Sequence, residues 1–179
     1  MKVVCFILLL IATSVIYCQD VNTLIAEAAK LEASLDEKAA YEKYRQVYRL
    51  QPNNLIALNK CSELCSRIGK REKNNELRKA YYQNAKNYAE AALRIQPANG
   101  ESNCVMAIAL GCVALDASSK EKVNAAKNIK QYLDKALQYD PGNFKAWHVL
   151  GRWHYEISGL NMFERAAVKI LFGGLPTSS

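Results

Sequence analysis

The chain has 179 residues, 50% of them hydrophobic and 23% charged, and its 24 Lys and Arg against 17 Asp and Glu give a net charge of +7. With only 8 Gly and 4 Pro, it is neither collagen-like nor low-complexity, and the composition indicates one globular domain. A chain of this size buries roughly 70% of its unfolded surface, so its core needs no disulfide or metal.

The first 18 residues are typical of a secretory signal. Lys2 provides a short positive start, and residues 3–17 form an apolar run that is interrupted only by Thr13 and Ser14. A membrane-spanning helix needs about 20 apolar residues, so we expect residues 1–18 to be a cleaved signal and the protein to be secreted or periplasmic. Cleavage could follow Ser14 or Cys18. The alternatives are lipid modification of Cys18 and an uncleaved membrane anchor formed by residues 1–18.

A repeated motif organises the remainder of the chain. Residues 48–54, 93–99 and 137–143 align without gaps, and each carries a proline followed two residues later by asparagine. Each proline ends an amphipathic helix, and asparagine favours the cap of the next one. The predicted unit is a helix, a turn, a second helix and a proline turn, with the prolines at Pro52, Pro97 and Pro141.

The apolar residues before each proline follow the 34-residue tetratricopeptide pattern. In the first unit, residues 21–54, the pattern positions are Leu24, Ala28, Leu31, Ala40, Tyr44, Val47 and Pro52. In the later units the second helix carries Ala85, Ala89 and Ala92, and then Ile129, Leu133 and Ala136. Extra residues lie between the helices at 69–79 and 116–122, and Ser118 with Glu121 forms a capping-box pattern. The second helices are therefore predicted to reach about 20 residues.

The fourth unit has Trp147, Leu150 and Gly151 at the signature packing positions of a first helix, with His154 where the pattern usually has tyrosine. A further helix is predicted from Met162 or Phe163 to Phe172, and residues 177–179 would suit the cap of yet another. We therefore expect residues 19–179 to be an all-α, tetratricopeptide-like α-solenoid of antiparallel helix pairs with elongated second helices, missing a C-terminal repeat.

The run Trp147-His-Val-Leu-Gly-Arg-Trp and the later segment Gly174-Leu-Pro176 resemble the regulator of microtubule dynamics proteins. The resemblance covers most of residues 37–179. It implies an all-helical, non-enzymatic domain. Animal members of the family are linked to microtubules and to tethering at membrane contacts, and this domain of one member is linked to lipid transfer. Bacterial relatives with secretory signals also look similar, and we expect a secreted relative of that kind or a fragment of one.

The cysteines and histidines do not form a metal or catalytic pattern. Cys61 and Cys65 lie on the packed side of a first helix, no Cys-x-x-Cys pair occurs, and we expect the four cysteines after the leader to be core residues; one disulfide is the alternative. His148 and His154 lie about 240° apart around a helix, and His154 is expected to be a hydrogen-bonded core residue. Because hydrolase, phosphate-loop and zinc-protease motifs are absent from the sequence, we expect no enzyme, cofactor or metal.

The predicted binding site is one face of the first helix of the fourth unit. Lys145, His148, Arg152 and Tyr155 fall within about 80° of one another, and Asn59 and Glu63 occupy equivalent positions two repeats earlier. First helices line the concave groove of such solenoids, so these six residues could hold an acidic peptide through charge-assisted hydrogen bonds. The alternative is an ordinary solvated face.

Residues 60–86 form a second basic cluster, in which Lys and Arg outnumber Glu. The cluster could meet microtubules through acidic tubulin tails, or an anionic membrane surface, whereas no nucleic-acid motif is present; simple solvation is the alternative. The sequence thus predicts a protein-binding scaffold. The other hypotheses are a membrane-anchored microtubule regulator or contact-site tether, and a carrier of an apolar ligand.

Overall fold

The computed structural model describes residues 20–159 together with Lys169 and Gly174. In this part of the chain the regular elements are seven α-helices and one short 3-10 turn. They are α2 (Val21–Ala33), α3 (Glu37–Leu50), α4 (Leu55–Arg71), α5 (Asn75–Ile95), α6 (Gly100–Val113), η1 (Ala114–Asp116), α7 (Ser119–Tyr139) and α8 (Phe144–Ser158). The leader, the helix predicted to end at Phe172 and the cap predicted at residues 177–179 lie outside the well-described residues.

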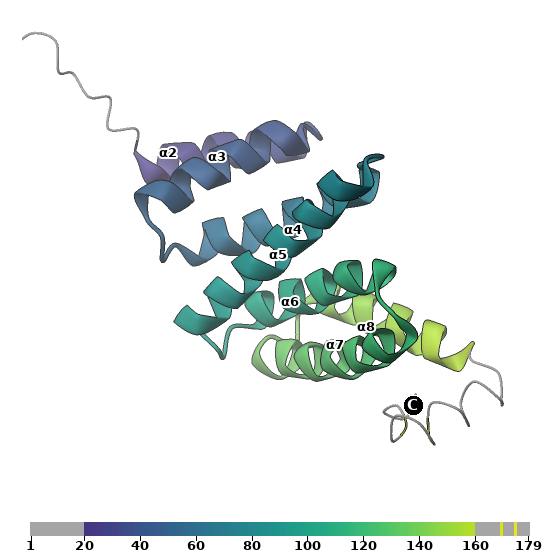
Figure 1. The fold of residues 1–179 in the computed structure, drawn as a ribbon. Coiled ribbons are helices and arrows are strands. Elements are labelled where there is room, and N and C mark those ends of the chain that lie inside the picture. The colour runs from purple at the N-terminus through teal and green to yellow at the C-terminus, as the bar shows by residue number, and fades with distance from the viewer. Residues whose placement is uncertain (1–19, 160–168, 170–173, 175–179) are drawn as a thin grey trace, which may run out of the picture.

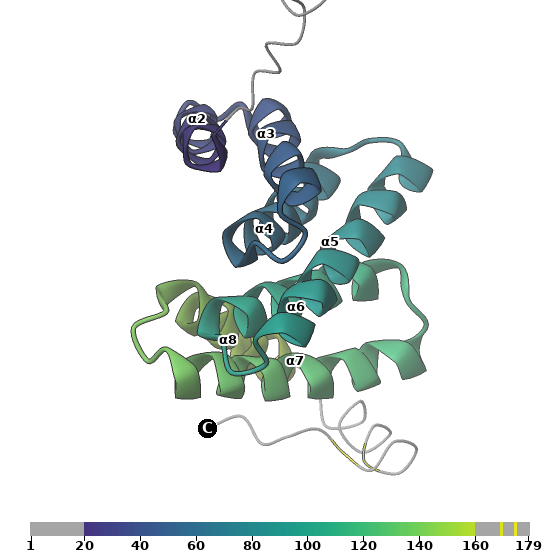
Figure 2. The ribbon, with the colours of Figure 1, turned by 90° about the vertical axis from the view of Figure 1, so that its left-hand side faces the viewer.

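The helices form successive antiparallel pairs, which confirms the predicted all-α solenoid. Helices α2 and α3, α4 and α5, and α6 and α7 pair and stack one after another, and α8 follows α7 (Figure 1). In the view turned by 90°, the first helices α2 and α4 lie to one side of their partners α3 and α5 (Figure 2). Helix α6 contacts α4, α5, α7 and α8. None of the described helices is long and apolar enough to cross a membrane.

The asparagine after each repeat proline caps the following helix, as predicted. Asn54 Oδ1 accepts from the backbone N–H of Ala57 at 3.0 Å. The side chains of Asn99 and Asn143 do the same at the starts of α6 and α8, each at 2.9 Å. These bonds satisfy backbone donors that have no partner within the helix. The proline turn therefore ends one helix and the asparagine starts the next.

The second helices of the later pairs are long, also as predicted. Helices α5 and α7 each contain 21 residues. The hydroxyl of Ser118 accepts from the Glu121 backbone N–H, and the Glu121 carboxylate accepts from the Ser118 backbone N–H, so the capping box is complete. Of the extra residues expected between the helices, 69–71 belong to α4, 75–79 to α5 and 119–122 to α7, so most of them lengthen the helices.

The tetratricopeptide register describes the core correctly. In the first pair the buried residues include Leu24, Ala28, Ala40, Tyr44 and Val47, while Leu31 is partly buried against them. The later second helices bury Ala85, Ala89, Ala92, Leu133 and Ala136, with Ile129 partly buried. Small residues let the helices approach closely. One such approach is direct, because Ser62 Oγ donates to the backbone carbonyl of Ala85 at 2.8 Å.

All four cysteines of the described region are free and buried, so the core-packing prediction is confirmed and the disulfide alternative is wrong. Burial raises the pKa of Cys65 to about 11 and that of Cys104 to about 12. Buried thiols that keep their proton are poor nucleophiles and poor metal ligands. Over the described ranges, no group of three or more His, Cys, Asp or Glu could hold a metal ion.

The predicted packing of α8 needs a correction at Trp147. This residue is 55% exposed, and its indole N–H donates to the Pro141 carbonyl, whereas Trp153 is buried and donates to the Ala126 carbonyl. The core stripe of α8 faces α6 and α7 and includes Trp153 and the partly buried Leu150. Leu58 and Asn103 occupy the position equivalent to Trp147 in the two preceding units, and both are buried. No described helix covers the corresponding side of α8.

Gly151 and His154 on α8 also differ from the packing predicted for them. A Cβ added to Gly151 would meet no atom within 4 Å, so among the described residues nothing packs closely there. His154 meets Trp153 edge-on, with 5.1 Å between the ring centroids. Its buried Nδ1 has no hydrogen-bond partner in the described part of the chain. The expectation of a hydrogen-bonded histidine is therefore wrong for this atom.

Candidate functional site

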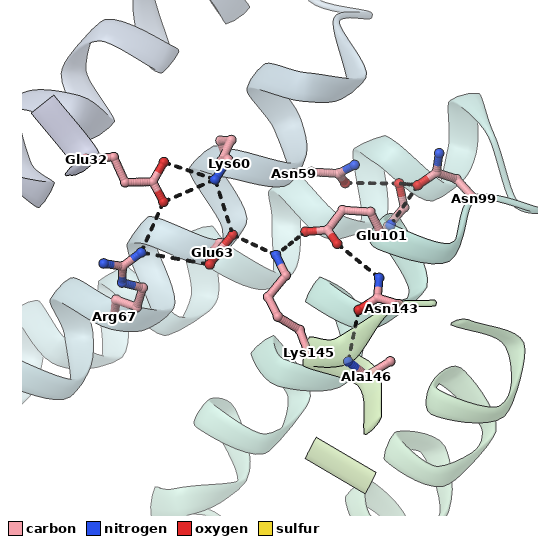
Figure 3. A network of polar contacts seen from close by, with 11 residues as sticks. Glu32, Asn59, Lys60, Glu63, Arg67, Asn99, Glu101, Asn143, Lys145 and Ala146 are labelled. Carbon is pink, nitrogen blue, oxygen red and sulfur yellow. Dashed lines mark hydrogen bonds and ion pairs between the residues drawn. The ribbon is translucent and has the colours of Figure 1, made fainter. Parts of the chain in front are cut away.

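The first helices carry a continuous row of charged side chains along one face (Figure 3). The row runs from α2 through α4 and α6 to α8, and each link joins side chains of different helices or of successive turns. We call it the polar row, and its members are Glu32, Lys60, Glu63, Arg67, Glu101 and Lys145.

Lys145 on α8 joins two earlier repeats at one end of the polar row. Its Nζ lies 3.0 Å from Glu63 Oε2 on α4 and also bonds the Glu101 carboxylate on α6. Burial disfavours the ammonium, but the hydrogen bond to Glu101 and the charges of both glutamates outweigh it and raise the pKa of Lys145. The second Glu101 oxygen accepts from Asn143 Nδ2 at 3.2 Å. Lys145 is therefore held in place as a cation.

The other end of the polar row is paired in the same way. Lys60 Nζ and Arg67 Nη1 lie 3.0 and 3.1 Å from the Glu32 carboxylate on α2. Arg67 and Arg71 both bond Glu37, whose side chain is only 4% exposed. These three cations on α4 thus share two carboxylates of the first helix pair.

A hollow of about 300 Å³ opens on this face between α4, α6 and α8. Its lining combines charged groups with apolar side chains. The lining residues are Glu63, Ser66, Arg67, Lys70, Ile108, Phe144, Lys145, His148 and Val149. The hollow can therefore receive an apolar group and offers hydrogen-bond donors beside it.

The structure brings three of the six predicted groove residues together. Glu63, Lys145 and His148 line the hollow. Asn59 is buried on α4, where its Oδ1 accepts from Ser102 Oγ at 2.9 Å. Arg152 lies 3.7 Å from Glu156 with 72% of its side chain exposed, and Tyr155 is 76% exposed. Neither of these last two lines the hollow.

The sequence reasoning missed most of the α4 contribution. Arg67 and Lys70 line the hollow, and they lie four and seven residues after Glu63 on the same helix. Residues at this spacing share a helix face. Extending the predicted stripe along α4 by this rule would have found both. Ile108, Phe144 and Val149 form the apolar wall of the hollow. No comparable pattern in the sequence pointed to these three residues.

The basic cluster at residues 60–86 is less positive than its own sequence suggests. Lys60, Arg67 and Arg71 pair with glutamates of α2 and α3, and Arg78 lies 3.4 Å from Asp116. Lys79 and Lys86 form pairs within α5. Carboxylates from other parts of the chain therefore neutralise much of the cluster.

Solved structures with this fold include repeat proteins of the same type. The first TPR of Spaghetti (RPAP3) bound to the HSP90 peptide SRMEEVD matches with a TM-score of 0.59 and 13% identity, over 79% of this chain and 95% of that one. The MamA RS-1 ArsTM double mutant matches with a TM-score of 0.56 and 18% identity, over 78% of this chain and 67% of that one. These likenesses show the fold.

Sequence comparison gives the family. Regulator of microtubule dynamics protein 3 of Xenopus laevis is 26% identical over 145 residues, which are 77% of this chain and 31% of that protein. Regulator of microtubule dynamics protein 1 of Caenorhabditis elegans is 29% identical over 119 residues, which are 66% of this chain and 50% of that protein. The chain thus spans half or less of these relatives. The family model for regulator of microtubule dynamics protein 1-3 matches residues 24–179, so the chain belongs to this family.

Proposed function

We propose that this chain is a non-enzymatic binding module that presents the face of its first helices to a segment of a partner protein. The observation that carries the proposal is the open hollow between first helices of three successive units. Tetratricopeptide-type folds act as scaffolds for protein interaction, and the Spaghetti domain is bound to a peptide. A rigid helical face with a small apolar hollow suits a short anchored segment.

Photo-crosslinking in extracts of the source organism tests this proposal. A photoreactive amino acid placed at His148, which is exposed and lines the hollow, is expected to capture a defined partner. The matched control carries the same group at Tyr139, which is 43% exposed on the second helix α7. Equal capture from both positions, or capture from Tyr139 alone, would contradict binding at the face of the first helices.

The family name favours a second candidate, a regulator that acts on microtubules. Residues 1–18 would anchor it to a membrane if they are not cleaved, and the resemblance described from the sequence extends this candidate to a tether at membrane contacts. Co-sedimentation with polymerised tubulin over a series of salt concentrations separates this from the first proposal. Specific binding should persist near physiological ionic strength, where exposed charges more than about 8 Å apart are screened. Binding that disappears there reflects only the net positive charge of the protein.

We also propose that residues 1–18 direct the protein across a membrane as a secretory signal. The motivation is their short apolar run behind a single lysine. Localising a tagged full-length protein and sequencing its mature N-terminus test this. A retained Met1 on a membrane-bound protein would instead support the anchor, and export would contradict a microtubule role.

A further inference from the structure

We propose that the hollow between α4, α6 and α8 binds one apolar side chain of a peptide that carries a single neighbouring carboxylate, and that it disfavours polyacidic segments. The inference rests on the proposed function, because it defines the ligand class of the same face. It follows from which cations of this face are already paired and which are not.

The paired cations are not available to a ligand. Lys145 bonds Glu63 and Glu101, and Arg67 bonds Glu32 and Glu37. A peptide carboxylate that drew Lys145 away would leave Glu101 without its cation and Glu63 without its shortest ion pair. One that drew Arg67 away would leave Glu32 and Glu37, 17% and 4% exposed, with one cation each instead of two. Either exchange is unfavourable, because the carboxylates that lose a cation stay partly desolvated.

Two other donors at the hollow remain available. Lys70 and His148 both line it and are exposed, and no carboxylate of the described residues lies within ion-pair distance of either. One comes from the last turn of α4 and the other from the middle of α8. A single carboxylate placed at the edge of the hollow could therefore be received by both helices.

The wall of the hollow favours an apolar group next to that carboxylate. Ile108, Val149 and Phe144 contribute to it, and Phe144 is 74% exposed, so the ring has much apolar surface left to cover. A volume of about 300 Å³ lies at the small end of ligand sites. It suits one or two side chains rather than a large ligand.

A polyacidic segment fits this face poorly. Its further carboxylates would lie beside Glu63 and Glu101, which are 14% and 32% exposed on either side of Lys145, and the cation between them is already paired. Leaving a partner's charges without a counter-charge is a common means of rejecting wrong partners. The pairing of the polar row thus selects for one negative charge near the hollow.

Panning a random heptapeptide library on the full chain tests the inference. Enriched peptides are expected to carry one Leu, Ile, Val, Met or Phe beside a single Asp, Glu or C-terminal carboxylate. For a synthetic consensus peptide, Lys70→Glu and Phe144→Ala should each raise Kd by about tenfold. The matched controls are Lys73→Glu, an exposed lysine after α4, and Tyr139→Ala on α7; both should leave Kd unchanged.

The other outcomes show whether the ligand class alone fails or the proposed binding function fails with it. Enrichment of polyacidic peptides, or of peptides without an apolar residue, would overturn the proposed ligand class. The proposed function would still stand if Lys70→Glu or Phe144→Ala weakened the binding of those peptides. If the Kd of the enriched peptides is unchanged by both substitutions, or if no peptide is enriched over the bare support, the proposed function is overturned as well.

Discussion

Lys145 is the residue that ties the polar row together across repeats. It contacts Glu63 on α4 and Glu101 on α6, residues that lie 82 and 44 positions earlier in the chain. Its side chain is 39% exposed, so solvent weakens each pair, yet Glu63 is only 14% exposed. The contribution of Lys145 to stability therefore arises mainly from keeping two partly buried carboxylates compensated.

We expect Lys145→Met to lower the free energy of unfolding by about 1–2 kcal/mol, because Glu63 and Glu101 then lose their shared cation. Urea denaturation measures the change. The control is Arg152→Met, which removes an exposed 3.7 Å pair with Glu156 and should change stability by no more than about 0.5 kcal/mol. Equal effects of the two substitutions would show that Lys145 is only a surface charge.

The buried thiols predict a loss of stability at alkaline pH. In the folded protein burial raises the pKa of Cys65 to about 11 and of Cys104 to about 12, while unfolded thiols ionise near pH 8.5. Because the folded pKa values are the higher ones, the thiol contribution is complete below about pH 8.5 and falls as pH rises, by at most about 1.4 kcal/mol per unit per thiol.

Urea denaturation between pH 8 and pH 10 under reducing conditions measures this slope. Cys65→Ala and Cys104→Ala are expected to lower stability at pH 8 but to make its decline with pH shallower. Tyrosines and lysines also titrate toward pH 10, so the difference between variant and parent isolates the thiol. An identical decline in all three proteins would contradict the assignment.

At the scale of single helices, close contact between successive elements constrains the start of α6. A Cβ added to Gly100 would lie 2.5 Å from Asp140 Cβ and 3.0 Å from the Ala136 carbonyl oxygen. Neither atom is the mobile end of a side chain. Glycine is therefore required where α6 begins beside the end of α7. Gly111, near the other end of α6, has only ordinary contact with Ile129 Cδ1 at 3.9 Å.

The two glycines of α6 should respond in opposite directions to the same substitution. Gly100→Ala is expected to destabilise the protein by about 1–3 kcal/mol, because the backbone of α6 or α7 must shift. Gly111→Ala should stabilise it by about 0.5–1 kcal/mol, since alanine restricts the unfolded chain and favours helix. Thermal and urea denaturation compare the two variants; destabilisation by both would contradict the open environment of Gly111.

For the whole molecule, the sequence predicts local regularities better than contacts between repeats. Proline and asparagine set the boundaries between successive units, where α3 gives way to α4, α5 to α6 and α7 to α8, so the caps formed by Asn54 and its equivalents were predictable. The partners of Lys145 were not, because ion pairs between repeats depend on how the pairs stack. Trp147 matched the packing signature but is 55% exposed, since its burial needs a covering helix that a motif match does not supply.

Helix α6 should be the most stable part of the molecule. It contacts four other helices, and its buried residues, which include Cys104, Val105 and Ala107, lie on several sides of the helix. Helix α2 lies at the end of the described stack and buries only Leu24 and Ala28 in the described structure. In a solenoid each repeat depends on its neighbours, so end helices open more easily than central ones.

Native-state hydrogen exchange should therefore show amides in the middle of α6 exchanging only through global unfolding, with the same urea dependence as the denaturation transition. Amides of α2 should exchange with an opening free energy lower by about 1 kcal/mol or more and with a shallower urea dependence. Lys60→Met, which removes the cation of α4 that lies 3.0 Å from Glu32 on α2, should lower the protection of α2 more than that of α6. Equal protection of the two helices, with equal urea dependence, would show that the polar row and the helix pairs behave as one cooperative unit.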